Sequence, residues 1–205
     1  MNAGQAISAL RRLGVPVLRT SDAAALFQQS TTAAQKTMMR LASAELVTPV
    51  RHGIWWIGNT VDPYRLPEYL TAPLPSYLSL QTALYLRGMI DQIPHIHYAA
   101  SLARTQRVTT RVGDYSIHHL EPNVFGEFEE TPGGTKLATA EKALFDFAYL
   151  SSTRSRLFTS LPELELPARF KLAKLKTWLA KISSQRSRTI TKEKLDQLLG
   201  RAHRS

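Results

Sequence analysis

Apolar residues recur at helical spacing in three short segments within the first sixty residues of the chain. In the first segment, Ile7, Leu10 and Leu13 lie three residues apart and predict one apolar helix face. The three expected helices cover residues 3–13, 23–28 and about 31–43. Side chains that can accept hydrogen bonds from free first-turn amides precede the second and third helices. The candidate caps are Ser21 or Asp22 for the second helix, and Ser30 or Thr31 for the third.

The third helix has two faces of different chemistry. Ala34, Met38 and Leu41 fall at positions i, i+4 and i+7, so we expect them to face the core. The opposite face holds mainly hydroxyl, amide and cationic groups and no carboxylate: Thr32, Gln35, Lys36, Met39 and Arg40. A glutamine can read the edge of a base, while threonine, lysine and arginine suit phosphate oxygens. This outer face is typical of a recognition helix.

A hairpin pattern follows the third helix. Two β-prone runs within residues 46–58 bracket the turn Arg51-His52-Gly53, in which Gly53 can supply a positive φ. The turn therefore places a cation at the hairpin tip. Three helices followed by a hairpin resemble a winged helix-turn-helix, so residues 1–60 are expected to form a DNA-binding domain. Such small folds also mediate protein contacts, but cations on the two elements that would meet a duplex favour DNA.

The rest of the chain alternates between helical and strand patterns, which predicts an α+β fold. Four prolines fall within residues 61–75 and indicate a linker, with a short helix around residues 66–70. An α+β domain is expected over residues 76–150. Its predicted elements are helices over residues 79–86 and 140–150, and strands over residues 96–102, 107–112 and 115–120.

Three local patterns refine this domain. Gly113-Asp114 is a strong hairpin-turn dipeptide between the last two strands. Thr139 can cap the helix that starts at residue 140, with Glu141 favourably placed near the positive end of its dipole. An exposed loop near Gly133 is expected to carry three acidic residues: Glu127, Glu129 and Glu130.

The C-terminal part, residues 151–205, predicts a basic helical extension. A helix over residues 168–182 is expected to bury one apolar stripe made of Leu172, Leu175, Leu179 and Ile182. Lys171, Lys174, Lys181 and Trp178 would lie beside that stripe. A polar linker is expected over residues 183–188, before a last helix capped by Thr191. The lysine face is either a second phosphate-contacting surface or the solvated side of a packed helix.

Charge and composition narrow the function classes. The 205 residues carry a net charge of +10 and no cysteine, which excludes a disulfide framework, a Cys-ligated zinc site and a thiol nucleophile. Counted from the sequence, residues 1–62 carry net +3, residues 63–150 net −2 and residues 151–205 net +9. Basic ends favour a polyanionic partner. Without a long apolar run or a signal-like N-terminus, we expect a soluble cytoplasmic protein that binds nucleic acid and not a membrane.

Several motifs in the first 150 residues resemble the AbiEi family, the antitoxins and transcriptional regulators of type IV toxin–antitoxin and abortive-infection systems. The motifs are Tyr77-Leu-Ser-Leu-Gln-Thr-Ala-Leu-Tyr-Leu-Arg-Gly88, Ile93-Pro-His-Ile-His97, Ser101-Leu-Ala-Arg-Thr105, Ser116-Ile-His-His119 and Lys136-Leu-Ala-Thr-Ala-Glu-Lys-Ala-Leu-Phe-Asp146. The resemblance covers roughly residues 3–150 and is most specific over residues 139–150. Ala140 departs from the proline that often follows the capping threonine, a conservative change at a helix start.

The resemblance implies a two-part regulator. Its N-terminal winged helix would bind inverted repeats in its own promoter and repress the operon. Its second domain would counteract a cognate nucleotidyltransferase-like toxin without needing a stable complex. Relatives vary at their C-terminal ends, so the resemblance implies nothing about the basic extension.

Two other functions remain open at this stage. The chain could be a protein-interaction module that neutralises a toxin by direct binding, with its net negative middle part docking on a basic surface. It could also be a metal-dependent enzyme, since His95 and His97 would share one face of a strand and Asp91 or Asp114 might complete a site. The sequence guarantees only two of the three or four ligands that such a site needs, and it contains no phosphate-binding loop or nucleophile elbow. Catalysis is therefore not expected, and neither is a cofactor.

The sequence thus assigns the DNA contacts to the third helix and the hairpin. Thr32, Gln35, Lys36 and Arg40 are expected to face the major groove. Ser30 and Thr31 would lie near phosphate at the helix start, while Arg51 and His52 would contact the backbone from the hairpin tip. Inverted repeats imply two copies on double-stranded DNA, one helical turn or a multiple of it apart.

Overall fold

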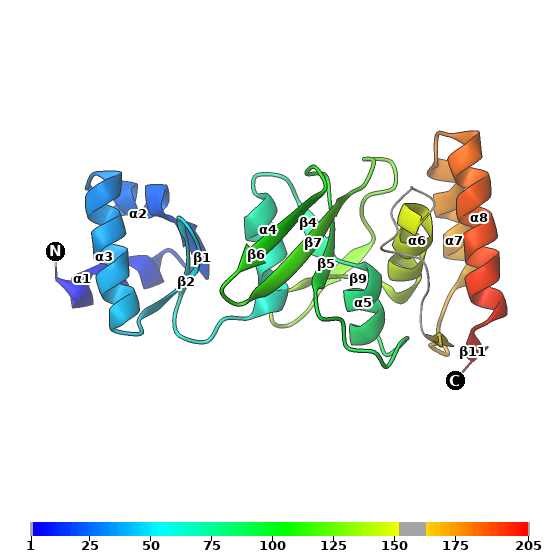
Figure 1. The fold of residues 1–205 in the computed structure, drawn as a ribbon, viewed down its shortest axis with the longest axis horizontal. Helices are drawn as coiled ribbons and strands as arrows, with labels where there is room; N and C mark the ends of the chain where they lie inside the picture. Colours follow the sequence, from blue (N-terminus) through cyan, green and yellow to red (C-terminus); the bar gives the residue numbers. More distant parts are fainter. Residues whose placement is uncertain (1, 152–162, 205) are drawn as a thin grey trace.

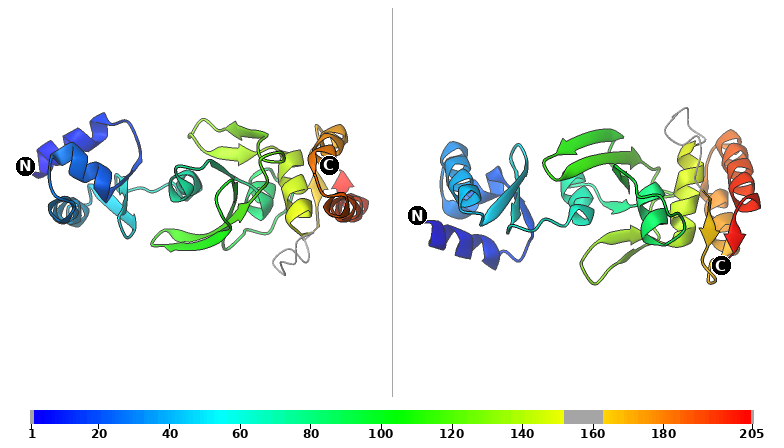
Figure 2. Two further views of the ribbon diagram at one scale, coloured as in Figure 1. Left: turned by 90° about the horizontal axis from the view of Figure 1, so that it is seen from above. Right: turned by 60° about the horizontal axis from the view of Figure 1, so that its bottom comes forward.

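The computed structural model describes residues 2–151 and 163–204. The chain is a mixed α+β protein, as its alternating patterns predict. Figures 1 and 2 show an elongated molecule with three parts in a row: an N-terminal unit, a central sheet with its helices, and a C-terminal layer of helices. The two ends of the chain lie at opposite ends of the long axis (Figure 1).

The N-terminal unit combines three helices with an antiparallel sheet of order β1-β3-β2. Its elements are α1 (Ala3–Arg12), β1 (Val17–Arg19), α2 (Thr20–Phe27), α3 (Thr31–Ser43), β2 (Val47–Arg51) and β3 (Ile54–Ile57). Ala34, Met38 and Leu41 on α3 are completely buried, which confirms the inward face predicted from their spacing. β1 follows α1 after a short connection and pairs with β3, with Val17 opposite Trp56.

The second helix begins earlier than the sequence suggests. α2 starts at Thr20, so the two expected caps, Ser21 and Asp22, lie inside its first turn. Asp22 instead accepts a hydrogen bond from the backbone N–H of Arg19 at 2.9 Å, as the third residue of a capping box does. The cap prediction was wrong because β1 keeps the backbone extended up to Arg19, and the helix starts directly where this strand ends.

The central part is built on a six-stranded sheet of order β6-β7-β5-β4-β9-β8, in which the β5–β7 and β4–β9 pairs are parallel. Its strands are β4 (Ser76–Leu78), β5 (His97–Ser101), β6 (Gln106–Thr110), β7 (Gly113–His119), β8 (Phe128–Glu130) and β9 (Lys136–Ala138). Its helical elements are the 3-10 turn η1 (Pro63–Arg65), α4 (Leu66–Thr71), α5 (Leu80–Leu86) and α6 (Ala140–Ser151). Thr139 caps α6 as predicted, its hydroxyl accepting from the Lys142 N–H at 3.3 Å.

Two connections in this sheet differ from expectation. The β6–β7 turn lies at Arg111 and Val112, whereas Gly113 and Asp114 already belong to β7. Gly113 has a φ of +146°, which other residues rarely adopt, and a Cβ atom there would lie 3.2 Å from Nε2 of His97. The expected acidic loop is largely the β8–β9 hairpin. Its strands have three residues each, too few for the alternation of apolar residues that would reveal a strand.

The C-terminal layer consists of β10 (Glu165–Leu166), α7 (Leu172–Lys181), α8 (Gln185–Gly200) and β11 (His203–Arg204). In Figure 1, α7 and α8 lie beside α6 on the side away from the N-terminal unit. Part of the expected extension, residues 152–162, lies outside the described residues.

Two expectations about this layer were wrong. Thr191 does not cap the last helix: α8 already starts at Gln185, and the Thr191 hydroxyl donates to the Ser187 carbonyl at 2.7 Å from within it. A threonine can satisfy its hydroxyl within a helix in this way, so its presence does not mark a helix start. On α7, Trp178 is buried with 2% exposure while Leu172 is 39% exposed. Leu172 is the first residue of α7, and the helix packs on the central core through Leu175 and Trp178 instead.

The N-terminal unit packs directly against the central sheet. Both parts contribute to one apolar cluster that contains Val17, Val50, Trp56, Leu66, Ala99, Val108, Tyr115 and Ile117. Two hydrogen bonds cross the same boundary: the Arg111 N–H donates to the Val50 carbonyl, and Arg19 Nη2 donates to the Ala72 carbonyl, each at 2.9 Å. The two parts therefore share buried apolar surface as well as a covalent connection.

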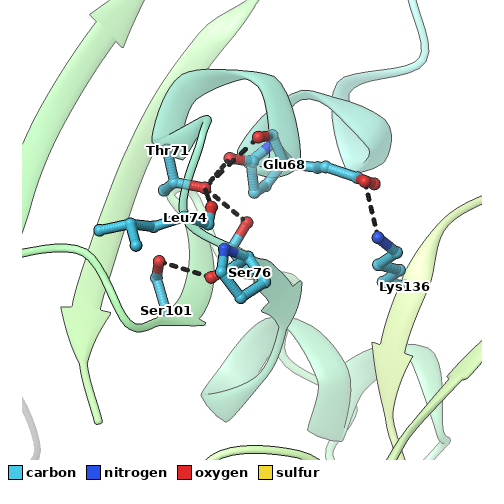
Figure 3. A network of polar contacts seen from close by, with 8 residues as sticks. Glu68, Thr71, Leu74, Ser76, Ser101 and Lys136 are labelled. Carbon is cyan, nitrogen blue, oxygen red and sulfur yellow. Dashed lines mark hydrogen bonds and ion pairs between the residues drawn. The ribbon is translucent and has the colours of Figure 1, made fainter.

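The connecting stretch between these parts is held by polar contacts (Figure 3). The Thr71 hydroxyl lies 2.9 Å from the Leu74 carbonyl oxygen and 3.1 Å from the Ser76 hydroxyl. Glu68 on α4 forms an ion pair with Lys136 on β9, with 2.6 Å between Oε1 and Nζ. Residues 61–75, which their prolines suggest as a linker, thus contain η1 and α4, and α4 is tied to the sheet that follows. Among the described helices, none is long and apolar enough to cross a membrane.

The core of the central part contains a buried ion pair. Lys142 and Asp146 on α6 are both fully buried and bonded to each other. Lys142 Nζ also donates to the Val124 carbonyl at 2.6 Å. Asp146 Oδ2 accepts from the Tyr77 hydroxyl at 3.0 Å and from the Ser79 hydroxyl at 2.7 Å. Burial lowers the pKa of Lys142 and raises the pKa of Asp146, while each charge opposes the shift of the other.

We expect Lys142→Met to lower the free energy of unfolding by about 3–5 kcal/mol, because it leaves the Asp146 carboxylate buried without its cation. Urea denaturation followed by circular dichroism measures this change. Lys192→Met is the matched control, since Lys192 also pairs with an aspartate four residues later but is 67% exposed. That control should cost less than about 1 kcal/mol. Equal losses in the two variants would contradict the role of the buried pair.

Candidate nucleic-acid interface

The first two turns of α3 face an open groove of 580 Å³ in the N-terminal unit. The groove is lined by the residues Arg19, Thr20, Ser21, Thr31, Thr32, Gln35, Lys36, His52 and Gly53. They come from three places: the start of α2, the start of α3 and the β2–β3 turn. Two of the nine are permanent cations and none is a carboxylate, so the groove offers a cationic, hydrogen-bonding surface.

Five of the residues expected to contact DNA therefore lie together. Thr31, Thr32, Gln35 and Lys36 project from the first two turns of α3, and His52 reaches the same groove from the β2–β3 turn. Thr31, Thr32, Lys36 and His52 are exposed, while Gln35 is half-buried.

The three remaining residues lie outside the lining of this groove. Ser30 caps α3: its exposed hydroxyl accepts from the Ala33 N–H at 3.2 Å. Arg40 lies one turn further along α3 and is exposed, with Nη2 donating to the Thr37 hydroxyl at 3.4 Å. Arg51 is exposed at the end of β2. Ser30 and Arg51 adjoin groove-lining residues in the chain, and Arg40 lies four residues beyond Lys36.

The Gln35 amide is not free at both ends. Its Oε1 atom accepts a hydrogen bond from the Thr20 hydroxyl at 2.9 Å. The same Thr20 oxygen accepts from the indole Nε1–H of Trp55, also at 2.9 Å. Thr20 and Trp55 are buried, with 6% and 2% exposure. A chain of two hydrogen bonds therefore joins β3, α2 and α3 beneath the groove.

Sequence reasoning missed Arg19 and Thr20. Both lie where β1 passes into α2, a junction that the sequence pattern places two or three residues too late. Arg19 lines the groove and also donates to the Ala72 carbonyl, so it lies between the groove and the central part. A Thr–Ser–Asp run at a helix start was the available signal, but it does not say which hydroxyl turns inward.

The histidines do not form the metal site considered above. β5 begins at His97, so His95 lies before the strand and is exposed. His97 is half-buried between the rings of Tyr64 and Tyr115, with ring centroids 5.3 and 5.1 Å away. Across residues 2–151 and 163–204, no three His, Cys, Asp or Glu side chains come together as metal ligands could. The pairing inferred from sequence spacing required a strand that includes His95, but β5 starts two residues after it.

His118 on β7 is buried, with 5% exposure, and its Nε2 lies 2.9 Å from the Ser116 hydroxyl. Burial, helped by the positive charge of Arg107, lowers the pKa of His118 to about 4. The neighbouring His119 is exposed, as expected for adjacent residues of a strand. His118 is therefore a neutral core side chain at neutral pH.

No protein-family model matches the sequence, and no curated protein matches it either. The AbiEi resemblance therefore stays a prediction from the quoted motifs. The function proposed below is argued from the side chains of the groove.

The low pKa of His118 makes stability depend on pH. The unfolded state takes up a proton near pH 6.5 and the folded state only near pH 4. Stability is therefore fully present above pH 6.5 and falls as the pH drops from 6.5 to 4, by up to about 3 kcal/mol. In urea melts at several pH values, His118→Gln should flatten this part of the profile. His119→Gln controls for loss of a neighbouring exposed histidine, and an unchanged profile in His118→Gln would contradict the assignment.

Proposed function

We propose that the chain is a DNA-binding transcriptional regulator whose N-terminal unit works as a winged helix-turn-helix. One observation carries this proposal: the outward side of α3 and the β2–β3 turn border one groove that holds cations, hydroxyls and an amide but no carboxylate. Phosphates and base edges together require this combination of groups. A surface meant only for solubility would not need to bring two separate elements together.

The order of elements supports the same proposal. Helix, strand, helix, helix and hairpin, with β1 completing the sheet, is the order in which a winged helix-turn-helix is built. α2 and α3 are separated by three residues, and Gln28 ends α2 in the left-handed conformation with φ 52°. α3 has 13 residues and is about 20 Å long, enough to lie along a major groove about 12 Å wide.

In this proposal each group has a definite role. Thr32, Gln35, Lys36 and Arg40 face the major groove, Ser30 and Thr31 lie near a phosphate, and Arg51 and His52 contact the backbone from the hairpin. The amides at the start of α3 add partial positive charge near that phosphate. Two copies would bind an inverted repeat with half-sites one helical turn or a multiple of it apart.

The wider role follows from the resemblance of residues 3–150 to AbiEi antitoxins. We infer that this cytoplasmic regulator represses its own operon and counteracts a nucleotidyltransferase-like toxin without a lasting complex. The acidic residues Glu127, Glu129 and Glu130 offer little support for direct docking, because two of the three have partners within the chain. Glu129 pairs with Arg87 at 2.8 Å and Glu127 lies 3.7 Å from Lys174. These pairs leave less charge for a basic partner.

The DNA-binding proposal is tested by the double variant Lys36→Ala/Arg40→Ala. Using fluorescence anisotropy with the protein's own upstream region, we expect the slope of log affinity against log salt to fall by about two units. The control variant Lys176→Ala/Arg186→Ala removes one lysine and one arginine from exposed positions on α7 and α8, at the opposite end of the molecule. The control should bind like wild type. Unchanged binding by the first variant, or equal losses in both, would refute the assignment of this surface.

The antitoxin proposal is tested by mixing the full chain with the nucleotidyltransferase-like toxin that the proposal assigns to it. On a sizing column the two proteins should elute separately, while the chain keeps its affinity for its upstream DNA. Stable co-elution would favour direct neutralisation and overturn the proposal that no lasting complex forms.

A further inference from the structure

The hydrogen bonds beneath the groove determine which way the Gln35 amide faces. An indole N–H can only donate, so the Thr20 oxygen must accept from Trp55. The Thr20 hydroxyl then has one hydrogen left, and it points to the Gln35 amide atom 2.9 Å away. The atom that receives this hydrogen is an acceptor, and in the structure it is the carbonyl oxygen Oε1. The orientation thus follows from the chemistry of the three groups.

Burial allows this arrangement to persist. Trp55 and Thr20 are 2% and 6% exposed, so water competes poorly for the first hydrogen bond. Turning the amide over would bring its N–H₂ group against a hydroxyl whose hydrogen already points toward it. If the hydroxyl turned away to accept, its oxygen would have to serve two donors and its hydrogen would lose its partner in a buried site. The inward position of Oε1 is therefore strongly preferred.

The consequence lies on the other side of the amide. With Oε1 held inward, Nε2 is the end of Gln35 available to the groove, and it carries two N–H donors and no acceptor. A glutamine that reads adenine in bidentate fashion needs both ends, since it accepts from N6 and donates to N7. Guanine presents two acceptors, O6 and N7, at its major-groove edge. A donor-only group can bond to both acceptors of guanine, but at adenine only N7 accepts and the N6 amino group is left without an acceptor, so guanine is preferred.

We propose that Gln35 is a donor-only reader of guanine, and that Thr20 and Trp55 are positioning residues that set this preference from beneath the groove. This inference rests on the proposed DNA-binding function and deepens it. It predicts that operator specificity at one base position depends on two buried side chains that act through Gln35 and read no base themselves. Removing either partner frees the amide to turn over and to accept from adenine.

The experiment compares base preference in wild type and variants. DNA sites are selected from a random pool with the full chain and with Gln35→Ala, and the position at which Gln35→Ala loses preference is the one that Gln35 reads. For wild type we expect guanine over adenine there by at least about fivefold in affinity, as a bidentate contact provides. Replacing that guanine by 7-deazaguanine should weaken wild type and leave Gln35→Ala unchanged.

Two variants test the positioning role. Thr20→Val removes the hydroxyl with little change of shape, and Trp55→Phe removes the indole donor while keeping an aromatic ring. Each should reduce the preference for guanine over adenine to about twofold or less while binding to phosphate persists. Thr48→Val is the matched control, since the Thr48 hydroxyl also donates within the N-terminal unit, to the Gly58 carbonyl at 2.8 Å. That control should keep the preference of wild type.

The outcomes separate the two proposals. Loss of all DNA binding by wild type overturns both the proposed function and this inference. Specific binding with adenine preferred at the Gln35 position, or with guanine preference unchanged in both Thr20→Val and Trp55→Phe, overturns the inference alone. The indole proton of Trp55 gives a readout without DNA: in wild type it should exchange slowly with solvent, and fast exchange would also overturn the inference. Because the two variants act at different buried positions, one that fails to fold leaves the other to decide.

Discussion

A charged lysine and a charged aspartate, one turn apart on α6, are enclosed where the central sheet meets the C-terminal helices. Lys142 holds the chain at Val124, and Asp146 holds the hydroxyls of Tyr77 and Ser79 at the β4–α5 junction. The ammonium group also lies 5.7 Å from the ring of Trp178 on α7. Burying two charges is costly unless each is satisfied on every side. The surrounding elements must therefore keep their positions, so this ion pair specifies how α6, β4, α5 and α7 pack together.

An ion pair and an apolar cluster connect the central part to the N-terminal unit. α4 is tied to β9 by Glu68 and Lys136, and its Leu66 is completely buried in the cluster shared with Val17 and Trp56. On β3, two adjacent tryptophans face opposite sides of the strand. Trp56 faces the central part, whereas Trp55 faces the helices and donates to Thr20. The period-two alternation of one short strand thus links the core of the molecule to the floor of the groove.

Much of the fold could be predicted from local patterns, and what could not depends on contacts between distant residues. The inward face of α3 follows from the spacing of Ala34, Met38 and Leu41, and the cap of α6 follows from Thr139. The expected groove residues were also adjacent on that helix. Trp55, however, lies 35 residues from Thr20, and Thr20 lies 15 residues from Gln35. No periodicity records such a chain of contacts. Thr191 shows the converse: a residue typical of helix starts is satisfied inside a helix because its hydroxyl bonds back to Ser187.

The shared cluster between the first two parts has a geometric consequence. If the two parts separated, water would reach Val50 and Trp56 on one side and Leu66 and Tyr115 on the other. The two parts are therefore held in a fixed arrangement and are not joined by a flexible linker alone. If α3 docks on a DNA duplex as proposed, the central and C-terminal parts are then held in a fixed direction relative to the duplex. When two copies bind a palindrome, steric contact between their central and C-terminal parts would limit how closely the two half-sites can be spaced. The packing between the N-terminal unit and the central part would then help to determine operator spacing, although it makes no contact with DNA.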